Sequence, residues 1–205
     1  MFIKNIDIVG GKTRFTADLV NGLISFPTYA VGLKCKKPDF VFASIYHLFG
    51  GLNKERVNGI LFNFTKISAT IEIANTEKKV LVSKGNDGYF HVYGGADPRS
   101  YRLVWLSRYG KEKAEYSRSR LLIRQWGSQE KTFERIMSDL EILDTGDIAL
   151  IDKIEDIVSR AHQSIVLHKM REITRRKSAQ IIFAFGEDSL FAQSLREFEI
   201  VNYEG

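Results

Sequence analysis

The last third of the chain alternates between strand-like and helix-like patterns, and this alternation constrains the fold more than any other feature. Apolar runs at 147–151, 179–185 and 198–203 predict strands, whereas residues 159–176 and 189–196 predict helices. Strands separated by helices join through right-handed crossovers and build a parallel sheet. The sequence therefore predicts an α/β fold whose parallel sheet comes from this region.

The first 96 residues have a different, β-rich pattern. Residues 2–9 alternate in polarity and 23–31 form an apolar run, so both predict strands. Residues 39–49 place apolar side chains at helical spacings after Asp39, a predicted N-cap. Beyond them, β-branched and aromatic runs separated by turn formers predict an antiparallel subsheet, with strands at 60–64, 68–73 and 79–83.

The middle of the chain is strongly basic. Between Arg99 and Arg124 eight Lys and Arg residues face only Glu112 and Glu115, and β-branched residues are few. We expect an exposed, helical subdomain over residues 97–142, which includes a helix at 131–142.

Composition and charge narrow the functional classes. The chain of 205 residues carries a formal charge of +5, and no apolar run approaches the ~20 residues that span a bilayer. The amino terminus lacks a signal-peptide pattern, so the cytoplasm is the expected location. The lone Cys35 excludes an intramolecular disulfide and a cysteine-rich zinc site, and the four histidines lack metal-ligand spacing.

The order of these elements resembles the nucleotide-binding domain of ABC-type ATPases. Residues 147–152 are similar to a Walker B strand, and the resemblance implies that Asp152 holds Mg²⁺ through water. An ordinary strand-end acid is the alternative for this residue. Residues 29–32 resemble the strand that enters a P-loop, which implies that Gly32 contacts nucleotide.

Two further segments carry the resemblance. Residues 179–185 are similar to the strand that delivers the switch histidine of the family. Residues 126–130 partly resemble the signature motif, which implies that Gly127 and Ser128 bind the nucleotide of an opposing subunit. A tryptophan followed by a plain helix N-cap explains the same residues equally well.

The implied fold is an ABC ATPase-like (P-loop NTPase-like) α/β domain with a mixed sheet, an antiparallel β subdomain and a helical subdomain. One such domain would fill residues 1–205, with a β-rich lobe at 1–96, the helical subdomain at 97–142 and a Walker B-like and switch region at 143–205.

The catalytic motifs depart from the family pattern. The loop after Gly32 contains Lys36, Lys37 and Pro38 in place of the glycines that surround phosphates. The two lysines could form a substitute phosphate site or a solvated basic loop. Lys153 stands where a carboxylate normally follows the Walker B aspartate, and Phe185 takes the position of the switch histidine. We expect no appreciable ATP hydrolysis, although the resemblance implies ATP and Mg²⁺ as cofactors.

Three functions remain open at this level. The resemblance is greatest to the ATP-binding subunit of polysaccharide exporters, which implies a dimer or hetero-oligomer with a homologous ABC subunit or a membrane permease at the inner face of the membrane. The basic segment from Arg99 to Arg124 motivates an alternative, a DNA-associated head of the recombination and chromosome-maintenance type. A non-catalytic α/β scaffold is the third hypothesis.

Overall fold

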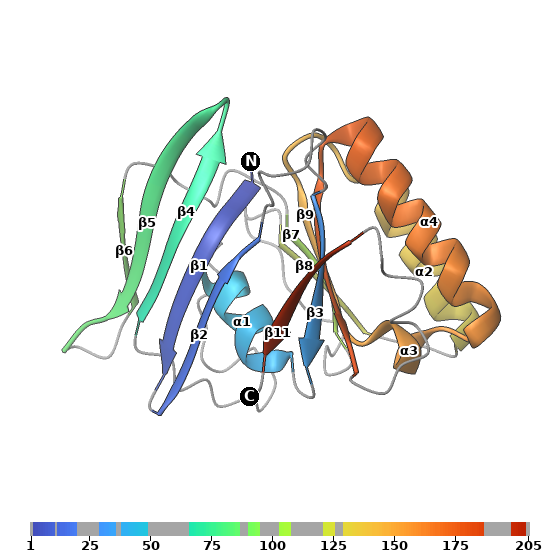
Figure 1. Ribbon diagram of the computed structural model, residues 1–205, viewed down its shortest axis with the longest axis horizontal. Coiled ribbons are helices and arrows are strands. Elements are labelled where there is room, and N and C mark those ends of the chain that lie inside the picture. Colours follow the sequence, from blue (N-terminus) through green and yellow to red (C-terminus); the bar gives the residue numbers. More distant parts are fainter. Residues whose placement is uncertain are drawn as a thin grey trace.

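The chain forms two β-sheets with helices between and beside them, as the computed structural model shows (Figure 1). The structure describes residues 2–10, 12–19, 29–35, 38–48, 66–86, 90–94, 103–107, 121–125, 129–186 and 198–203. Within these residues no helix combines the length and apolar character needed to cross a bilayer.

The first sheet is antiparallel and has the strand order β2-β1-β4-β5-β6. Its strands are β1 (Phe2–Gly10), β2 (Thr13–Asp18), β4 (Lys66–Ile73), β5 (Thr76–Lys84) and β6 (Phe90–Gly94). The hairpin between β4 and β5 turns at Ala74 and Asn75, whose φ angles of 48° and 60° match the right-handed twist of the strands. The antiparallel subsheet is therefore confirmed at 68–73 and 79–83, whereas the strand predicted at 60–64 lies outside the described residues.

The second sheet is parallel and has the strand order β11-β3-β10-β9-β7-β8. Its strands are β3 (Ala30–Cys35), β7 (Leu103–Ser107), β8 (Leu121–Gln125), β9 (Ile148–Ile151), β10 (Gln180–Phe185) and β11 (Glu199–Tyr203). The parallel arrangement expected for the last third of the chain is confirmed. The helix predicted at 189–196 lies outside the described residues.

The helical interpretation of the basic middle segment is wrong at two places. β7 and β8 both fall within it, and they pair in parallel with each other at one edge of the second sheet. Trp105 of β7 is 1% exposed, so this part of the segment is core rather than surface. Short apolar runs between arginines fitted a strand as well as a helix, and the sheet edge decided the outcome. The other residues between 97 and 120 are not described.

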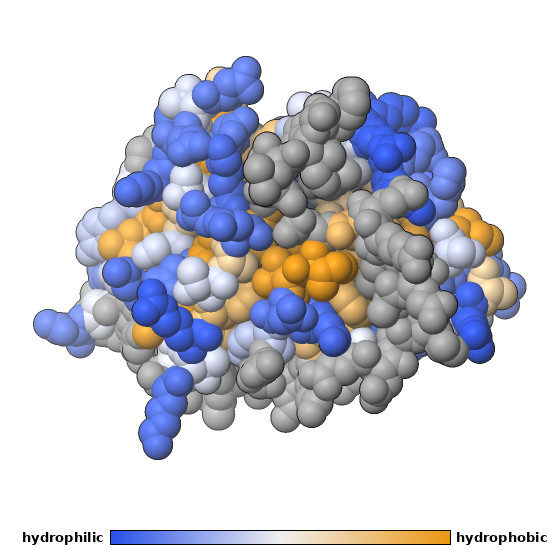
Figure 2. Space-filling view, in the orientation of Figure 1, coloured by the Kyte–Doolittle hydropathy of each residue, from blue (hydrophilic) through white to orange (hydrophobic). Residues whose placement is uncertain are grey.

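Four helices complete the described structure: α1 (Asp39–Leu48), α2 (Gln129–Glu141), α3 (Ile154–Ile157) and α4 (Arg160–Lys177). In Figure 1, α1 lies between the two sheets, whereas α2 and α4 cover the opposite face of the parallel sheet. In the space-filling view, hydrophilic residues gather over the carboxyl half of α4 at the upper right (Figure 2).

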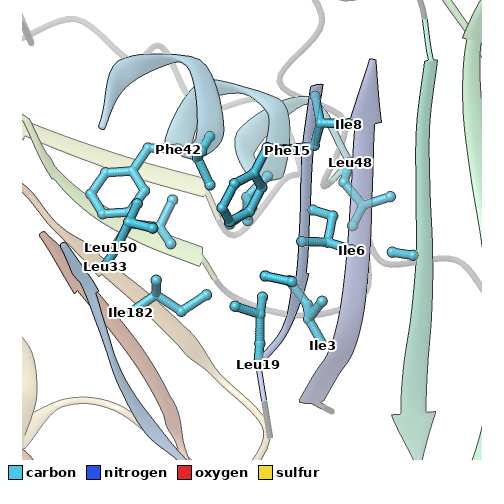
Figure 3. Packing of buried hydrophobic residues seen from close by; sticks show 14 of the residues in the cluster. Ile3, Ile6, Ile8, Phe15, Leu19, Leu33, Phe42, Leu48, Leu150 and Ile182 are labelled. Atoms are coloured by element: carbon cyan, nitrogen blue, oxygen red, sulfur yellow. The ribbon is translucent and has the colours of Figure 1, made fainter. Parts of the chain in front are cut away.

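Two hydrophobic cores hold these layers together. The first fills the space around α1, where Phe42 lies beside Leu33 and Leu150 of the parallel sheet (Figure 3). Ile182 of the parallel sheet and Ile6 of the antiparallel sheet belong to the same cluster. The second lies on the other face of the parallel sheet and joins it to α2, α3 and α4. The parallel sheet is therefore covered on both faces, which accounts for its uninterrupted apolar strands.

Candidate functional site

The carboxyl ends of three central strands define the candidate site. β10 lies between β3 and β9, and Phe183 is the register partner of both Gly32 in β3 and Ile151 in β9. Asp152, which follows Ile151 directly, therefore sits one strand away from the end of β3. The carboxyl edge of a parallel sheet is where open α/β proteins bind ligands. Asp152 and the carboxyl end of β3 thus belong to the same edge of the parallel sheet, with β10 between them.

Asp152 is a buried carboxyl group at this edge, with 3% of its surface exposed. Leu150 belongs to the core around α1 and Ile151 to the core on the opposite face. If the strand alternation continues, Asp152 points toward the α1 side of the sheet. Burying a carboxylate costs free energy unless another group compensates its charge. Buried carboxyl groups at strand ends therefore often occur in ligand sites. Its assignment as a metal ligand stays a prediction.

The structure places Gly32 inside β3 rather than at the start of a loop. A Cβ at this position would come within 2.9 Å of Ile200 Cδ1 and within 3.0 and 3.1 Å of the rings of Phe185 and Phe183. The missing side chain makes room for these neighbours, so Gly32 serves the packing of the sheet. Gly32 therefore lies within a strand rather than in the loop that the sequence predicted there, and its contact with nucleotide stays a prediction.

The connection between β3 and α1 is too short for a P-loop. Only Lys36, Lys37 and Pro38 separate Cys35, the end of β3, from the first residue of α1. Proline has no backbone N–H to offer a phosphate, and a phosphate cradle needs several successive N–H groups. Lys36 and Lys37 themselves lie outside the described residues, so their predicted phosphate contacts remain predictions.

Most described side chains in the first turns of α1 are buried in the core. Phe42 and Ala43 are both fully buried; the resemblance, aligned on Gly50 and Gly51 after the helix, would put the P-loop lysine and serine at these two positions. The ring of Phe42 meets the Trp105 ring edge-on at 6.3 Å between centroids. Ser44 donates its hydroxyl hydrogen to the Phe40 carbonyl at 2.6 Å. Phe42 and Ala43 carry no charge or hydroxyl group, and the Ser44 hydroxyl is bonded to the helix backbone, so the described residues do not fit ATP in the manner of a P-loop.

The catalytic positions beside Asp152 are equally altered. Phe185 is 2% exposed and belongs to the core beneath α4, so a ring packs at the position where the resemblance would put the switch histidine. Lys153 follows Asp152 and is half-buried. Among the residues that the structure describes, no three His, Cys, Asp or Glu side chains come together in a way that could hold a metal ion.

Glu155 is a residue of this edge that the sequence did not single out. Its Oε1 accepts the backbone N–H of Gly186, which follows Phe185 at the end of β10. Burial raises the pKa of the Glu155 carboxyl above its ordinary value of 4.5, although the Gly186 hydrogen bond acts in the opposite direction. Its Oε2 is buried and has no hydrogen-bond partner in the described structure.

This contact joins α3 to the end of β10. A Cβ on Gly186 would lie 2.8 Å from Glu155 Oε1, so the glycine permits the close approach. The sequence signal was an acidic residue three positions after Asp152. The pairing itself joins residues 31 apart in the chain, and no local pattern indicates it.

Gly127 and Ser128, the residues of the signature-like segment, lie outside the described residues. Helix α2 begins at Gln129, directly after them, and carries Glu130 in its first turn. The segment thus precedes a helix, as both hypotheses for it require, and its proposed contact with a partner's nucleotide stays a prediction.

Comparisons with known proteins agree with this geometry. No protein-family description matches the chain, and no curated protein is significantly similar to it in sequence. Solved structures are similar in fold. An SMC head bound to the C-winged helix domain of ScpA superposes with a TM-score of 0.55 and 10% identity, covering 94% of this chain and 91% of that one. The SMC head domain from Thermotoga maritima gives 0.50 and 9%, covering 94% and 92%.

The fold is thus that of ABC ATPase-like head domains, with an antiparallel sheet, a central parallel sheet and flanking helices. This fold generally works with ATP and Mg²⁺. Sequence identities of about 10% establish the fold alone.

Proposed function

We propose that this chain is a head-like domain of the chromosome-maintenance type that has lost ATP turnover and acts through a protein partner. The observation that carries the proposal is the connection between β3 and α1, which keeps the ABC-type topology but leaves three residues where a P-loop would stand. Positioning and charge stabilisation account for almost all catalysis of phosphoryl transfer, and this connection supplies little of either.

The chromosome-maintenance type is favoured over the transporter type because both solved structures described above are SMC heads. The transporter hypothesis, with a permease partner at the inner membrane face, draws on the sequence resemblance only. Under either hypothesis the cytoplasm is the proposed location, and a homologous subunit is a candidate partner.

The similar structure with ScpA suggests a class of partner for this chain. In that complex an SMC head is bound to a winged-helix domain. A winged-helix protein is therefore a second candidate partner.

Nucleotide turnover provides the test of lost activity. We expect the purified chain to hydrolyse MgATP no faster than its Asp152→Ala variant, and a fluorescent ATP analogue to bind weakly or not at all. Turnover that disappears in the Asp152→Ala variant would contradict the proposal, because it would show a working metal site at the end of β9. Circular dichroism of both proteins establishes that they are folded.

Association provides the test of partner-dependent action. ABC-type heads that use ATP come together around it, whereas a head without a phosphate cradle should associate independently of nucleotide. Sedimentation velocity with and without MgATP should therefore give the same distribution of species. An ATP-dependent dimer that is lost in the Asp152→Ala variant would reject the proposal.

A further inference from the structure

Helix α4 concentrates positive charge on one surface of the molecule. Its 18 residues contain six Lys and Arg residues and one carboxylate, a net charge of +5 that equals the formal charge of the entire chain. One face of the helix is buried in the core through Val166, Leu167, Met170, Ile173 and Thr174. The opposite face is directed outward, and its carboxyl half is hydrophilic in Figure 2.

Part of this charge is neutralised within the protein. Glu172 binds Lys169 at 3.0 Å and Arg176 at 3.1 Å. Glu141, from the end of α2, binds Lys169, Arg176 and Lys177. These contacts lie along one flank of the helix and join it to α2.

Two positive charges on the other flank of the helix are not neutralised by ion pairs among the described residues. Arg160 and Arg175 are exposed, and neither forms an ion pair within the part of the chain that the structure describes. His168 is exposed two turns before Arg175 on the same face. A hollow of about 430 Å³ opens along this face, and its described lining is His168, Arg171, Glu172, Arg175 and Arg176.

We propose that the exposed face of α4 binds the phosphate backbone of a duplex nucleic acid. An 18-residue helix is about 27 Å long, which covers roughly eight base pairs of a DNA strand at 3.4 Å per step. Arginine offers a planar fork of donors that suits phosphate oxygens. A row of such groups binds a linear polyanion with higher affinity, because each contact with a phosphate releases condensed counterions.

The composition of the face favours nucleic acid over other anionic partners. A protein interface normally needs buried aromatic or aliphatic anchors, and a lipid surface needs an apolar helix face. Ile165, which is 46% exposed, is the one large apolar residue that the described α4 presents to solvent. The inference rests on the proposed chromosomal setting, but it assigns a surface that is separate from the nucleotide edge.

The test measures binding of a fluorescein-labelled DNA duplex, longer than α4, by anisotropy over a range of salt concentrations. The wild-type chain should bind, and its affinity should fall steeply with salt. The Arg160→Gln/Arg175→Gln variant should bind more weakly, and the slope of log K against log salt should be shallower by about 2 if each arginine contacts one phosphate.

The matched control removes the same charge from another surface. Lys79 is exposed in β5 and Lys12 is exposed in the turn between β1 and β2. The antiparallel sheet to which these strands belong lies on the side of the molecule away from α4 (Figure 1). Lys12→Gln/Lys79→Gln should leave both affinity and slope nearly unchanged. All four substituted positions are exposed, and circular dichroism checks that each variant is folded. The single Arg175→Gln variant should change the slope of log K against log salt by about 1.

Three results would overturn the inference. Equal losses in the two double variants would mean that affinity follows net charge rather than α4. Competition by polyglutamate as strong as that by unlabelled DNA would assign the face to an acidic protein. Absence of wild-type binding at low salt would reject a nucleic-acid partner. Each leaves the loss of ATP turnover to be judged by its own experiment.

Discussion

The side-chain amide of Gln180 forms two hydrogen bonds with the backbone of Ile3: Oε1 accepts the Ile3 N–H at 2.8 Å, and Nε2 donates to the Ile3 carbonyl at 2.9 Å. The same Nε2 reaches the Leu19 carbonyl at 3.3 Å. β1 pairs with β2 only from Asn5 onward, so Gln180 takes the place of a strand partner for Ile3. Gln180 is fully buried and begins β10, so this contact joins the parallel sheet to the antiparallel sheet.

Gln180→Leu should destabilise the whole domain. The substitution leaves the N–H and carbonyl of Ile3 and the carbonyl of Leu19 without their partner, and each unsatisfied buried group costs about 1–3 kcal/mol. We expect the free energy of unfolding to fall by at least about 2 kcal/mol, measured by urea unfolding with an unchanged m-value.

Gln163→Leu is the control for this substitution. Its amide reaches the Val158 carbonyl at only 3.5 Å, within α4 and the turn before it. A change within about 0.5 kcal/mol is expected. Similar losses in the two variants would show that the link between the sheets is unimportant.

Gly32→Ala should be destabilising through overpacking. The new methyl group meets Ile200 Cδ1 and the rings of Phe183 and Phe185 at 2.9–3.1 Å, and all three are held in the sheet. A cost of about 1–3 kcal/mol is expected from thermal or urea unfolding.

Ile200→Val removes the closest of these atoms and tests the cause. In the Gly32→Ala/Ile200→Val protein the loss should be smaller than the sum of the two single losses, by about 0.5 kcal/mol or more. Strict additivity would mean that the two residues are not in competition for the same space.

Glu155→Gln should change how stability depends on pH. Because burial raises the pKa of Glu155 in the folded state, the folded protein holds this proton more tightly than the unfolded chain does. The resulting stability is fully present below the ordinary value of 4.5 and is lost as the pH rises through the higher folded pKa. The amide cannot ionise and still accepts the Gly186 N–H through its oxygen.

The comparison between the two proteins isolates this group. Relative to wild type, the Gln variant should gain stability as the pH rises from 4 to 7, as measured by urea unfolding midpoints at several pH values. If the stability of the Gln variant relative to wild type stayed constant or fell over this pH range, the assignment of Glu155 as a desolvated carboxyl would be contradicted.

Glu141→Gln should weaken the junction between α2 and α4 in a way that depends on pH and salt. The hydrogen bond from Lys169 is the main reason why the pKa of Glu141 is lowered, and Arg176 contributes. Its contribution to stability is therefore present above the ordinary pKa of 4.5 and is lost as the pH falls through the lower folded value. Thermal unfolding should show a modest loss at neutral pH that fades in high salt.

The same variant bears on the surface of α4. Glu141→Gln removes the carboxylate that pairs with Lys177 and one of the two that pair with Arg176, so duplex DNA should bind more tightly to the variant than to wild type. Weaker binding would contradict the inference that the positive charge of α4 contacts phosphate.

Local patterns were sufficient for the elements that lie wholly within one short segment. Runs of β-branched and aromatic residues separated by turn formers predicted β4 and β5, and the strand-helix alternation after residue 143 predicted β9, α4, β10 and β11. The same reasoning failed at β7 and β8, because a run of about five apolar residues carries no helical or strand period of its own. There the edge of the parallel sheet, rather than the segment, selected the strand.

The sequence by itself determined the α/β class and the parallel sheet, because these follow from residue types in short stretches. Only the tertiary structure decided the roles of Gly32, Gln180 and Glu155. Each of those roles depends on a residue far away in the chain, and the distance between such residues is set by how the two sheets and their helices pack. The role of a glycine in a strand, or of a buried amide, depends on that packing, and no local sequence pattern indicates it.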